Sequence, residues 1–393
     1  MIIKPKVRGF ICTTSHPKGC DRSVFEQIEY AKSHGQISKG PKNVLIIGGS
    51  TGYGLASRIA TAFGAGSKTL SVSYEKEPDS KRTASAGWYN TIAFDKYARH
   101  EGLYAKSING DAFSHQIKKE VAEIIEQDLG KVDLIVYSLA SPRRVHPDSG
   151  AVYNSALKPI GQAYFNKTVD PLRGIVKDID IQPADSNDIS NTIEVMGGED
   201  WEMWIDYLSD NDLLDEKVIT MAYSYIGPSL THPIYKDGTI GMAKNHLNET
   251  ALKISKKLNI KLGGLAFVSV NKALVTQASS AIPVVPLYIS ILYKLMKEKN
   301  THEGCIEQMV RLFSQKVYNS MADNIELDEN RQIRLDDWEM DSDIQNEISR
   351  VWSEVTTDNL NELTDINGYK EDFYRLFGFG FSEVDYDEDI NLI

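Results

Sequence analysis

Residues 43–63 read NVLIIGGSTGYGLASRIATAF, and this stretch decides the fold class of the 393-residue chain. Residues 44–47 form a short, entirely apolar run, the pattern of a strand that is covered on both faces. The glycines begin where that strand ends, and residues 55–63 follow with helix-forming residues and an apolar face. A strand, a glycine-rich turn and a helix in this order predict the start of a βαβ unit.

The glycine-rich turn, GGSTGYG at residues 48–54, follows the strand directly. Gly48 allows a tight turn, Gly52 lets a pyrophosphate approach the N–H groups at the helix N-terminus, and Gly54 allows the helix to pack closely on the strand. The pattern favours dinucleotide binding over the alternative, a plain strand-to-helix turn. A phosphate-binding P-loop is disfavoured, because Gly-Lys-Ser/Thr is absent there.

Strands and helices continue to alternate over most of the chain. We expect further strands at residues 69–74, 104–108, 132–139, 218–224 and 265–270. We expect helices within residues 21–39 and at residues 55–63, 88–100, 114–128, 199–208, 239–258 and 305–318. This order predicts an α/β fold of the Rossmann type, with a doubly wound parallel sheet.

Residues 145–190 break the alternation with short apolar-polar segments separated by Pro and Gly, which predicts inserted β-hairpins. We expect one enlarged dinucleotide-binding and catalytic domain over residues 1–393. Its additions are an N-terminal extension at 1–40, the hairpin lobe at 145–190 and a C-terminal helical extension at 300–393. The C-terminal extension is expected to contain a hairpin around residues 328–331 and an acidic helical tail.

Composition excludes several classes of protein. The 43 basic and 55 acidic residues give a net charge of −12, which argues against nucleic acid or an anionic membrane as the main partner. The longest apolar stretch, residues 281–296, is shorter than the ~20 residues of a bilayer span and contains prolines and a lysine. With no secretory signal at the N-terminus, we expect a cytoplasmic protein. Cys12, Cys20 and Cys305 lack metal-site spacing, so we expect no metal.

Glu75 lies 27 residues after Gly48, at the predicted end of the second strand. A carboxylate there can accept hydrogen bonds from the adenosine ribose hydroxyls, which favours NADH over NADPH. A solvated surface acid is the alternative. Lys76, Lys81 and Arg82 could instead meet a 2′-phosphate.

Two further pairs of residues follow predicted strands. Asp111-Ala112 could hold the adenine edge, and Leu139-Ala140 could lie against the riboses. A purely structural role for each pair remains an open alternative.

Reduction by hydride leaves negative charge on a substrate oxygen, which requires a proton donor such as a Tyr beside a cation. Spacing alone does not select among the Tyr–Lys pairs of the chain, so location has to decide. Tyr235 follows the strand at 218–224, at the carboxyl edge of the sheet, where ligands bind. Lys244 comes nine residues later, in the early turns of a helix expected to start near Thr239. Tyr225 is a second hydroxyl able to reach a substrate carbonyl, and structural roles stay open for both tyrosines.

At these residues the chain resembles the FabV-type enoyl-acyl-carrier-protein reductases and the closely related trans-2-enoyl-CoA reductases, enlarged relatives of the short-chain dehydrogenases. The resemblance covers essentially the whole chain. It rests on the ordered blocks HPKGC at 16–20, GGSTGYGLASRI, AGWYN at 86–90, DLIVYSLASP, VMGGEDW at 195–201, AYSYIGP, IYKDGTIGMAK, AFVSVNKALVTQAS and HEGCIEQ at 302–308.

The resemblance implies NADH as the cofactor and assigns roles to individual residues. The cofactor phosphates would be held by Gly48, Gly49, Ser50, Thr51, Gly52 and Tyr53. The adenosine side would be held by Tyr74, Glu75, Asp111, Ala112, Leu139 and Ala140, and a further cofactor segment would be Leu274, Val275 and Thr276. Tyr235 is the implied proton donor, Lys244 the anchor of the nicotinamide ribose, and Tyr225 a substrate contact.

We therefore expect NADH-dependent reduction of trans-2-enoyl thioesters of coenzyme A or acyl carrier protein, in fatty acid synthesis or butyrate-type metabolism. Lys244 is expected to lower the pKa of Tyr235 through its charge. Residues 281–287 are an expected wall for the acyl chain, with a core helix as the alternative. The alternative functions are a carbonyl reductase of the short-chain-dehydrogenase type and a dinucleotide-binding module without chemistry. We expect a monomer, with a homodimer as the alternative.

Overall fold

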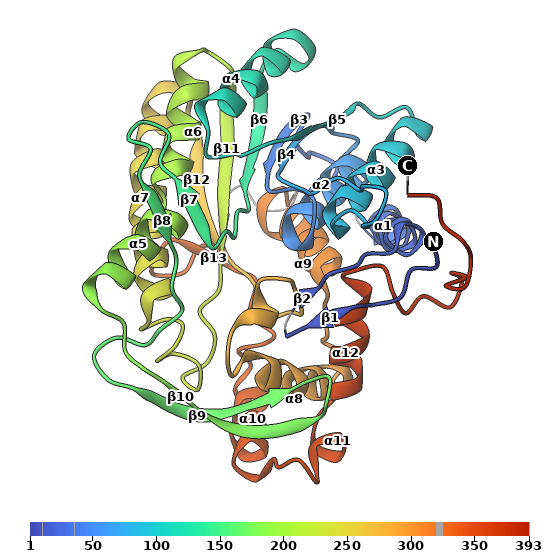
Figure 1. Cartoon of the computed structure of the whole chain (residues 1–393). Helices are drawn as coiled ribbons and strands as arrows, with labels where there is room; N and C mark the ends of the chain where they lie inside the picture. The colour runs from blue at the N-terminus through green and yellow to red at the C-terminus, as the bar shows by residue number, and fades with distance from the viewer. Residues whose placement is uncertain (10, 35, 320–324, 393) are drawn as a thin grey trace.

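The computed structural model describes residues 1–9, 11–34, 36–319 and 325–392. Its centre is a parallel sheet of seven strands in the order β13-β12-β11-β6-β3-β4-β5 (Figure 1). In chain order these are β3 (Asn43–Ile47), β4 (Lys68–Ser73), β5 (Ala105–Asn109), β6 (Val132–Tyr137), β11 (Leu214–Ser224), β12 (Leu265–Val270) and β13 (Gln332–Arg334). The strand order changes direction between β3 and β6, so the predicted doubly wound fold is confirmed.

Helices cover both faces of this sheet (Figure 1). One face carries α1 (Pro17–His34), α2 (Gly52–Ala65), α3 (Ala86–His100) and α9 (Cys305–Arg311). The other carries α4 (His115–Ile124), α6 (Glu199–Asp210) and α7 (Thr239–Leu262), with α5 (Ser186–Met196) packed on α7. A third apolar core joins α8 (Val285–Glu298), α10 (Ser342–Glu354), α11 (Leu360–Leu363) and α12 (Ile366–Arg375) to the loop after β12. Within the described ranges, no helix is long and apolar enough to cross a bilayer.

Strand β3 shows how the sequence produces these layers. Val44 and Ile46 lie in the core with α1, α2 and α3, whereas Leu45 and Ile47 lie in the core with α4, α6 and α7. All four side chains are fully buried. Because successive side chains of a strand point to opposite faces, a strand covered on both sides has to be apolar at every position.

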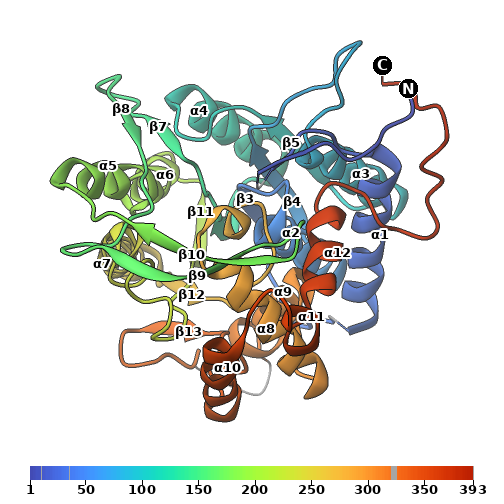
Figure 2. The same ribbon diagram turned by 60° about the horizontal axis from the view of Figure 1, so that its bottom comes forward.

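The predicted hairpins in residues 145–190 are confirmed. Strands β7 (Arg143–Val145) and β8 (Val152–Asn154) form one antiparallel pair, and β9 (Tyr164–Asp170) and β10 (Ile175–Ile181) form the other. The second hairpin extends across α8 at the edge of the molecule (Figures 1 and 2). Lys167 fixes it to the end of α10 by donating to the carbonyls of Trp352 and Val355.

The expected hairpin around residues 328–331 is wrong. The carboxylate of Asp328 accepts the N–H groups of Asn330 and Gln332, both at 2.9 Å, and so closes a turn. The turn leads into β13, which pairs parallel with β12 and becomes the edge of the main sheet. A strand of three residues has too few side chains to show the alternation of apolar and polar residues that predicts a strand. Only its pairing with β12 identifies β13 as a strand.

Three further elements, two strands and a helix, were not expected. Strands β1 (Val7–Arg8) and β2 (Ile11–Cys12) form a short antiparallel pair in the N-terminal segment. Helix α5 begins with a capping box, in which Asp185 accepts the N–H of Asp188 and Asp188 accepts the N–H of Asp185. The helix expected at 114–128 also changes character, because α4 ends at Ile124 and a π-helical turn η1 (Ile125–Leu129) follows.

A buried ion pair connects α4 to α6. Lys118 Nζ lies 2.6 Å from Asp200 Oδ1, and the two side chains are 1% and 3% exposed. Tyr137 at the end of β6 donates its hydroxyl to the other carboxylate oxygen of Asp200, at 3.1 Å. The pair is therefore fully shielded from water and saturated with hydrogen bonds, the condition in which removal of one partner is most costly.

Lys118→Met should destabilise the protein by about 3–5 kcal/mol, because it leaves the Asp200 carboxylate buried without its cation. The double variant Lys118→Met/Asp200→Leu should recover part of that loss, since no unpaired charge remains. Urea denaturation measures both effects. Lys119→Met is the matched control on the same helix, because the Lys119 side chain is 71% exposed. Equal losses for Lys118→Met and Lys119→Met would contradict the prediction.

Candidate active site

A cavity of about 660 Å³ opens at the carboxyl ends of β3, β4, β5 and β6. Parallel sheets bind ligands at this edge, and the switch between β3 and β6 lies in its middle. Among the residues singled out from the sequence, the cavity is lined by Gly48, Ser50, Thr51, Gly52, Tyr53, Tyr74, Glu75, Asp111, Ala112, Leu139, Ala140 and Thr276. The fold therefore brings four separate chain segments and the loop after β12 to one wall.

The glycine-rich turn has no room for side chains at two positions. Gly48 has φ +90°, and a Cβ there would lie 2.1 Å from the carbonyl oxygen of Ser138. A Cβ on Gly54 would lie 2.0 Å from the carbonyl oxygen of Gly48. Both contacts are far inside van der Waals distance, so these positions require glycine. Helix α2 then starts at Gly52, with its first N–H groups beside the cavity.

Glu75 follows β4 and lines the cavity with the neighbouring Tyr74, whose side chain is 79% exposed. The Ser50 hydroxyl donates to Glu75 Oε1 at 2.5 Å, and the Glu75 backbone N–H donates to Asn109 Oδ1 at 2.7 Å. The same carboxylate oxygen lies 2.0 Å from the position of a Cβ on Gly87, in the first turn of α3. Glu75 is thus a fixed group of the cavity wall, held by the turn and close to a helix N-terminus.

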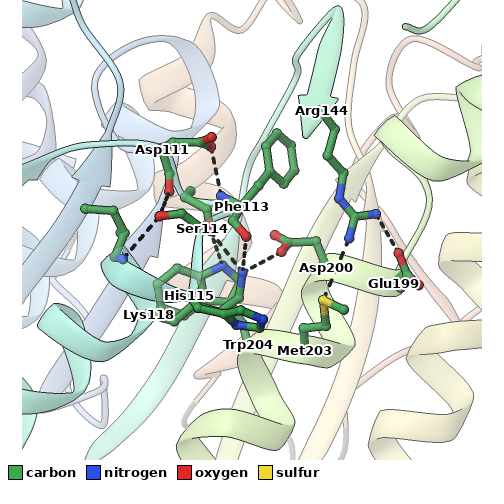
Figure 3. A network of polar contacts seen from close by, with 12 residues as sticks. Asp111, Phe113, Ser114, His115, Lys118, Arg144, Glu199, Asp200, Met203 and Trp204 are labelled. Atoms are coloured by element: carbon green, nitrogen blue, oxygen red, sulfur yellow. Dashed lines mark hydrogen bonds and ion pairs between the residues drawn. The ribbon is translucent and has the colours of Figure 1, made fainter. Parts of the chain in front are cut away.

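The loop after β5, which lines the cavity with Asp111, Ala112 and Phe113, is held by buried donors (Figure 3). Lys118 Nζ donates to the carbonyl oxygens of Ala112 and Phe113, each at 3.1 Å. The indole N–H of Trp204 donates to the same Ala112 oxygen, also at 3.1 Å. Since Lys118 is itself paired with Asp200, the buried ion pair of α4 and α6 fixes the backbone of a cavity-lining loop.

Six of the residues singled out from the sequence do not line this cavity. They are Gly49, Tyr225, Tyr235, Lys244, Leu274 and Val275. Gly49 packs against β4, where a Cβ would lie 2.3 Å from Ser71 Oγ. Leu274 and Val275 are buried directly before Thr276, which does line the cavity.

Tyr235 lies in the loop between β11 and α7, and α7 begins at Thr239 as predicted. Its side chain is 8% exposed and packs edge to face against Tyr225, with 5.0 Å between ring centroids. Gly241 lets the first turn of α7 fold onto this loop, because a Cβ there would lie 1.7 Å from the carbonyl oxygen of Lys236. The two tyrosines of the predicted site are therefore neighbours.

Lys244 lies in the second turn of α7, where its Nζ donates to the carbonyl oxygen of Tyr223 at 2.8 Å. Burial lowers the pKa of Lys244 to about 8 and raises the pKa of Tyr235. The expected lowering of the Tyr235 pKa by Lys244 is therefore wrong, because desolvation dominates at both groups. A raised pKa keeps the Tyr235 hydroxyl protonated, so it is suited to donate a hydrogen bond.

The apolar stretch at 281–287 belongs to the protein interior over most of its length. Val284, Val285 and Leu287 are at most 2% exposed and lie in the third apolar core. Val284 has φ +73°, an unusual conformation for a β-branched residue, directly before α8 begins at Val285. For these three side chains the core-helix alternative is the better description.

Sequence reasoning missed other residues that line the cavity. These are Ser73, Gly110, Phe113, Ser138, Ser141, Pro142, Arg143, Val145, Gln277, Ala278 and Leu376. Most of these residues are immediate neighbours of predicted positions. Their place directly after a predicted strand is the feature of the sequence that could have identified them. Leu376 follows α12 and had no local signal, because only the packing of the C-terminal helices brings it to the cavity.

Three family models match the chain. A model described as the trans-2-enoyl-CoA reductase catalytic region matches residues 82–318. A model described as the NAD(P)H binding domain of trans-2-enoyl-CoA reductase matches residues 2–80, which include the glycine-rich turn. A third, described as an enoyl reductase FAD binding domain, matches residues 327–390.

The segment at 327–390 does not fit a flavin dinucleotide. Its strand β13 is followed by Asp336, Asp337 and Glu339 and not by a glycine-rich turn, and carboxylates at that position repel a pyrophosphate. Its helices α10 and α12 use their apolar faces to fill the third core. The chemistry of this chain is therefore derived without flavin.

Curated relatives cover the whole chain. An enoyl-[acyl-carrier-protein] reductase [NADH] of Coxiella burnetii is 58% identical over 100% of this chain and 96% of its own length. A trans-2-enoyl-CoA reductase [NADH] of Ruminiclostridium cellulolyticum is 55% identical over 100% of this chain and 98% of its own length.

Solved structures show the same fold. The trans-2-enoyl-CoA reductase of Clostridium acetobutulicum in complex with NADH has a TM-score of 0.97 and 46% identity, covering 100% of this chain and 98% of that one. The trans-2-enoyl-CoA reductase of Treponema denticola in complex with NAD has a TM-score of 0.95 and 49% identity, covering 99% and 98%. With a catalytic-region model over 82–318 and relatives matched end to end, this chain belongs to the trans-2-enoyl-CoA reductase family, which includes the FabV-type enoyl-acyl-carrier-protein reductases.

Proposed function

We propose that the protein catalyses the NADH-dependent reduction of trans-2-enoyl thioesters to saturated acyl thioesters. The observation that carries this proposal is the cavity of about 660 Å³ whose wall combines the glycine-rich turn with Glu75 at the carboxyl edge of the sheet. The proposal is supported by relatives that are named NADH-dependent enoyl reductases and that match this chain over nearly their whole length. A carbonyl reductase or a dinucleotide-binding module without chemistry has no such support.

In this proposal the turn at residues 48–53 holds the cofactor phosphates, and Glu75 holds the adenosine ribose. The N–H groups at the start of α2 supply donors and a favourable dipole for the phosphates. Asp111, Ala112, Leu139 and Ala140 line the adenosine side, with Tyr74 at its exposed edge. Thr276 continues this wall from the loop after β12.

NADH, when bound, supplies the hydride that adds to C3 of the enoyl group, and the thioester oxygen then develops negative charge. Tyr235 is the proposed donor to that oxygen, because burial keeps its hydroxyl protonated. Lys244 is the proposed anchor of the nicotinamide ribose, from a side chain already directed by the Tyr223 carbonyl. The enolate then takes up a proton from water at C2, which completes the reduction.

The direct test is NADH oxidation with crotonyl-CoA and, in parallel, with crotonyl-acyl carrier protein. The family includes relatives named for each carrier, and the enoyl chemistry is the same on both. Turnover of either thioester supports the proposal, and the ratio of kcat/KM values identifies the carrier. Turnover of simple ketones in the absence of thioester turnover would overturn it. A monomeric state and a cytoplasmic location remain predictions.

Tyr235→Phe should keep NADH binding and folding but lose turnover by about 10²–10⁴-fold, because only the hydrogen bond to the developing oxyanion is removed. Steady-state kinetics with crotonyl thioester and NADH fluorescence titration measure the two effects. Tyr30→Phe on α1 is the control, since Tyr30 lies outside the cavity lining. Near-wild-type turnover of Tyr235→Phe would exclude Tyr235 as the donor.

Lys244→Ala should raise the KM for NADH as well as lower kcat, because the ribose anchor is lost. In the wild type, the KM for NADH should rise as the pH increases through about 8, since Lys244 loses its charge above its lowered pKa. Lys253→Ala, on an exposed part of α7, is the control. A KM for NADH that neither the substitution nor the pH changes would contradict this role.

Glu75→Ala should raise the KM for NADH about tenfold, the effect of one charged hydrogen bond, and lower the KM for NADPH, because the repulsion of the 2′-phosphate disappears. The kcat with NADH should change little, since the adenosine end lies far from the reacting atoms. Glu77→Ala is the matched control, an exposed acid two residues away. If the wild type already prefers NADPH, or the ratio of the two KM values does not move, Glu75 is only a surface acid.

A further inference from the structure

Glu339 is a buried carboxylate that touches the proposed substrate site from the C-terminal segment. It lies after β13 and is 0% exposed. Its Oε1 accepts the hydroxyls of Tyr225 at 3.1 Å and Tyr288 at 2.6 Å, and its Oε2 accepts the N–H of Ala273 at 2.7 Å. The same carboxylate thus binds the predicted substrate tyrosine and the loop that leads to the cofactor segment.

The direction of these hydrogen bonds is fixed by groups that can only donate. The side-chain amide of Gln345 donates from Nε2 to the Tyr288 hydroxyl at 3.2 Å and to the Glu339 carbonyl at 2.7 Å. Tyr288 therefore accepts on that side, and its own proton points to Glu339. The backbone N–H of Ala273 also can only donate. Both carboxylate oxygens of Glu339 are consequently acceptors.

Burial and the neighbours of Glu339 act on its pKa in opposite directions. Burial raises its pKa, and the charge of Lys272 together with the hydrogen bonds from Tyr288 and Ala273 acts in the opposite direction. Lys272 is 2% exposed and donates to the carbonyl of Ala273, and burial lowers the pKa of Lys272 to about 8. Tyr288 and the Ala273 N–H both donate to Glu339, and Tyr225 is likewise the donor in its bond to Oε1.

A tyrosine hydroxyl has a single proton. When Tyr225 gives it to Glu339, the rest of the oxygen carries lone pairs only. The backbone of Gly227, with φ +72°, packs closely beside this oxygen, because a Cβ there would lie 2.5 Å from Tyr225 Oη. The ring of Tyr235 packs against Tyr225 with 5.0 Å between ring centroids, and within the described part of the chain no side chain forms a hydrogen bond with the Tyr235 hydroxyl.

We propose that Glu339 is a positioning residue that turns the Tyr225 proton away from the substrate, so that Tyr225 is an acceptor and Tyr235 is the only donor of the tyrosine pair. This inference rests on the proposed enoyl reductase function. It reverses the role expected of Tyr225 from the sequence, because a hydroxyl committed to Glu339 has no proton left for a substrate carbonyl. It also gives residues 327–390 a part in the reaction that needs no flavin.

Glu339→Gln tests the direction of the hydrogen bond between Tyr225 and Glu339, because an amide side chain can satisfy the neighbouring groups in one orientation only. The N–H of Ala273 requires an acceptor, so the amide oxygen has to face Ala273 and the amide NH₂ has to face Tyr225 and Tyr288. The hydrogen bond with Tyr225 is then reversed. The freed Tyr225 hydroxyl can then donate to the substrate oxygen itself and draw that oxygen away from its position at Tyr235, whose ring packs against Tyr225.

The experiment is a double-mutant cycle of Glu339→Gln and Tyr225→Phe with crotonyl-CoA and NADH. Glu339→Gln alone should lower kcat about tenfold and leave the KM for NADH within about twofold of wild type. In the Tyr225→Phe background it should change kcat by less than about twofold, since the hydroxyl through which Glu339 acts is gone. An equal loss in both backgrounds, or no loss in either, would overturn the inference.

Glu303→Gln is the matched control. Glu303 is a second buried carboxylate, 5% exposed, bound by Arg311 and Gln308 and not by a tyrosine of the site. It should lower the thermal stability without a change in kcat. If Glu339→Gln does not fold, Glu339→Asp replaces it with the same expectation, because the shorter carboxylate no longer reaches Tyr225. A wild type that fails to reduce crotonyl-CoA or crotonyl-acyl carrier protein refutes the proposed function instead.

Discussion

Three backbone segments meet at Gly48 with no space for a side chain, and the rest of the site depends on that contact. The turn after β3 touches the Ser138 carbonyl after β6, and Gly54 of α2 touches the carbonyl of Gly48 itself. This fixes the start of α2 against the point where the strand order reverses. These backbone contacts fix the distance between the N-terminus of α2 and the ends of the strands, and so they shape the cavity. Because the contacts are between backbone atoms, side-chain motion does not change that distance.

The residues proposed for catalysis are polar groups that burial holds in defined states. Desolvation keeps Tyr235 protonated and brings the pKa of Lys244 to about 8, close to neutrality. A site that excludes water strengthens each remaining hydrogen bond, so the direction of a single proton on Tyr225 matters chemically. Glu339 sets that direction from a segment that is otherwise structural. Glu339 therefore connects the C-terminal segment to Tyr225 and, through Ala273, to the loop after β12 that reaches the cavity.

Local patterns were sufficient wherever an element is defined by its own side chains. The apolar run of β3, the strand at 265–270 and the start of α7 at Thr239 all appeared in the sequence as the structure has them. The expected hairpin at 328–331 failed for the opposite reason. The short β13 has no period of its own and is a strand only because β12 offers it an edge. Local chemistry predicted the turn there but not its partner.

Local sequence was enough for the Rossmann-type sheet, the glycine-rich turn and the acid at the end of β4, because each depends on neighbours within one βα unit. The roles of Tyr235 and Lys244 stay predictions. Tertiary structure alone decided which of them share the cavity, that burial and not Lys244 governs the pKa of Tyr235, and that Glu339 meets Tyr225. Glu339 and Tyr225 are 114 positions apart in the chain, and neither local sequence predicts the contact between them. Such contacts form only when the core closes, since packing and desolvation are properties of the whole chain.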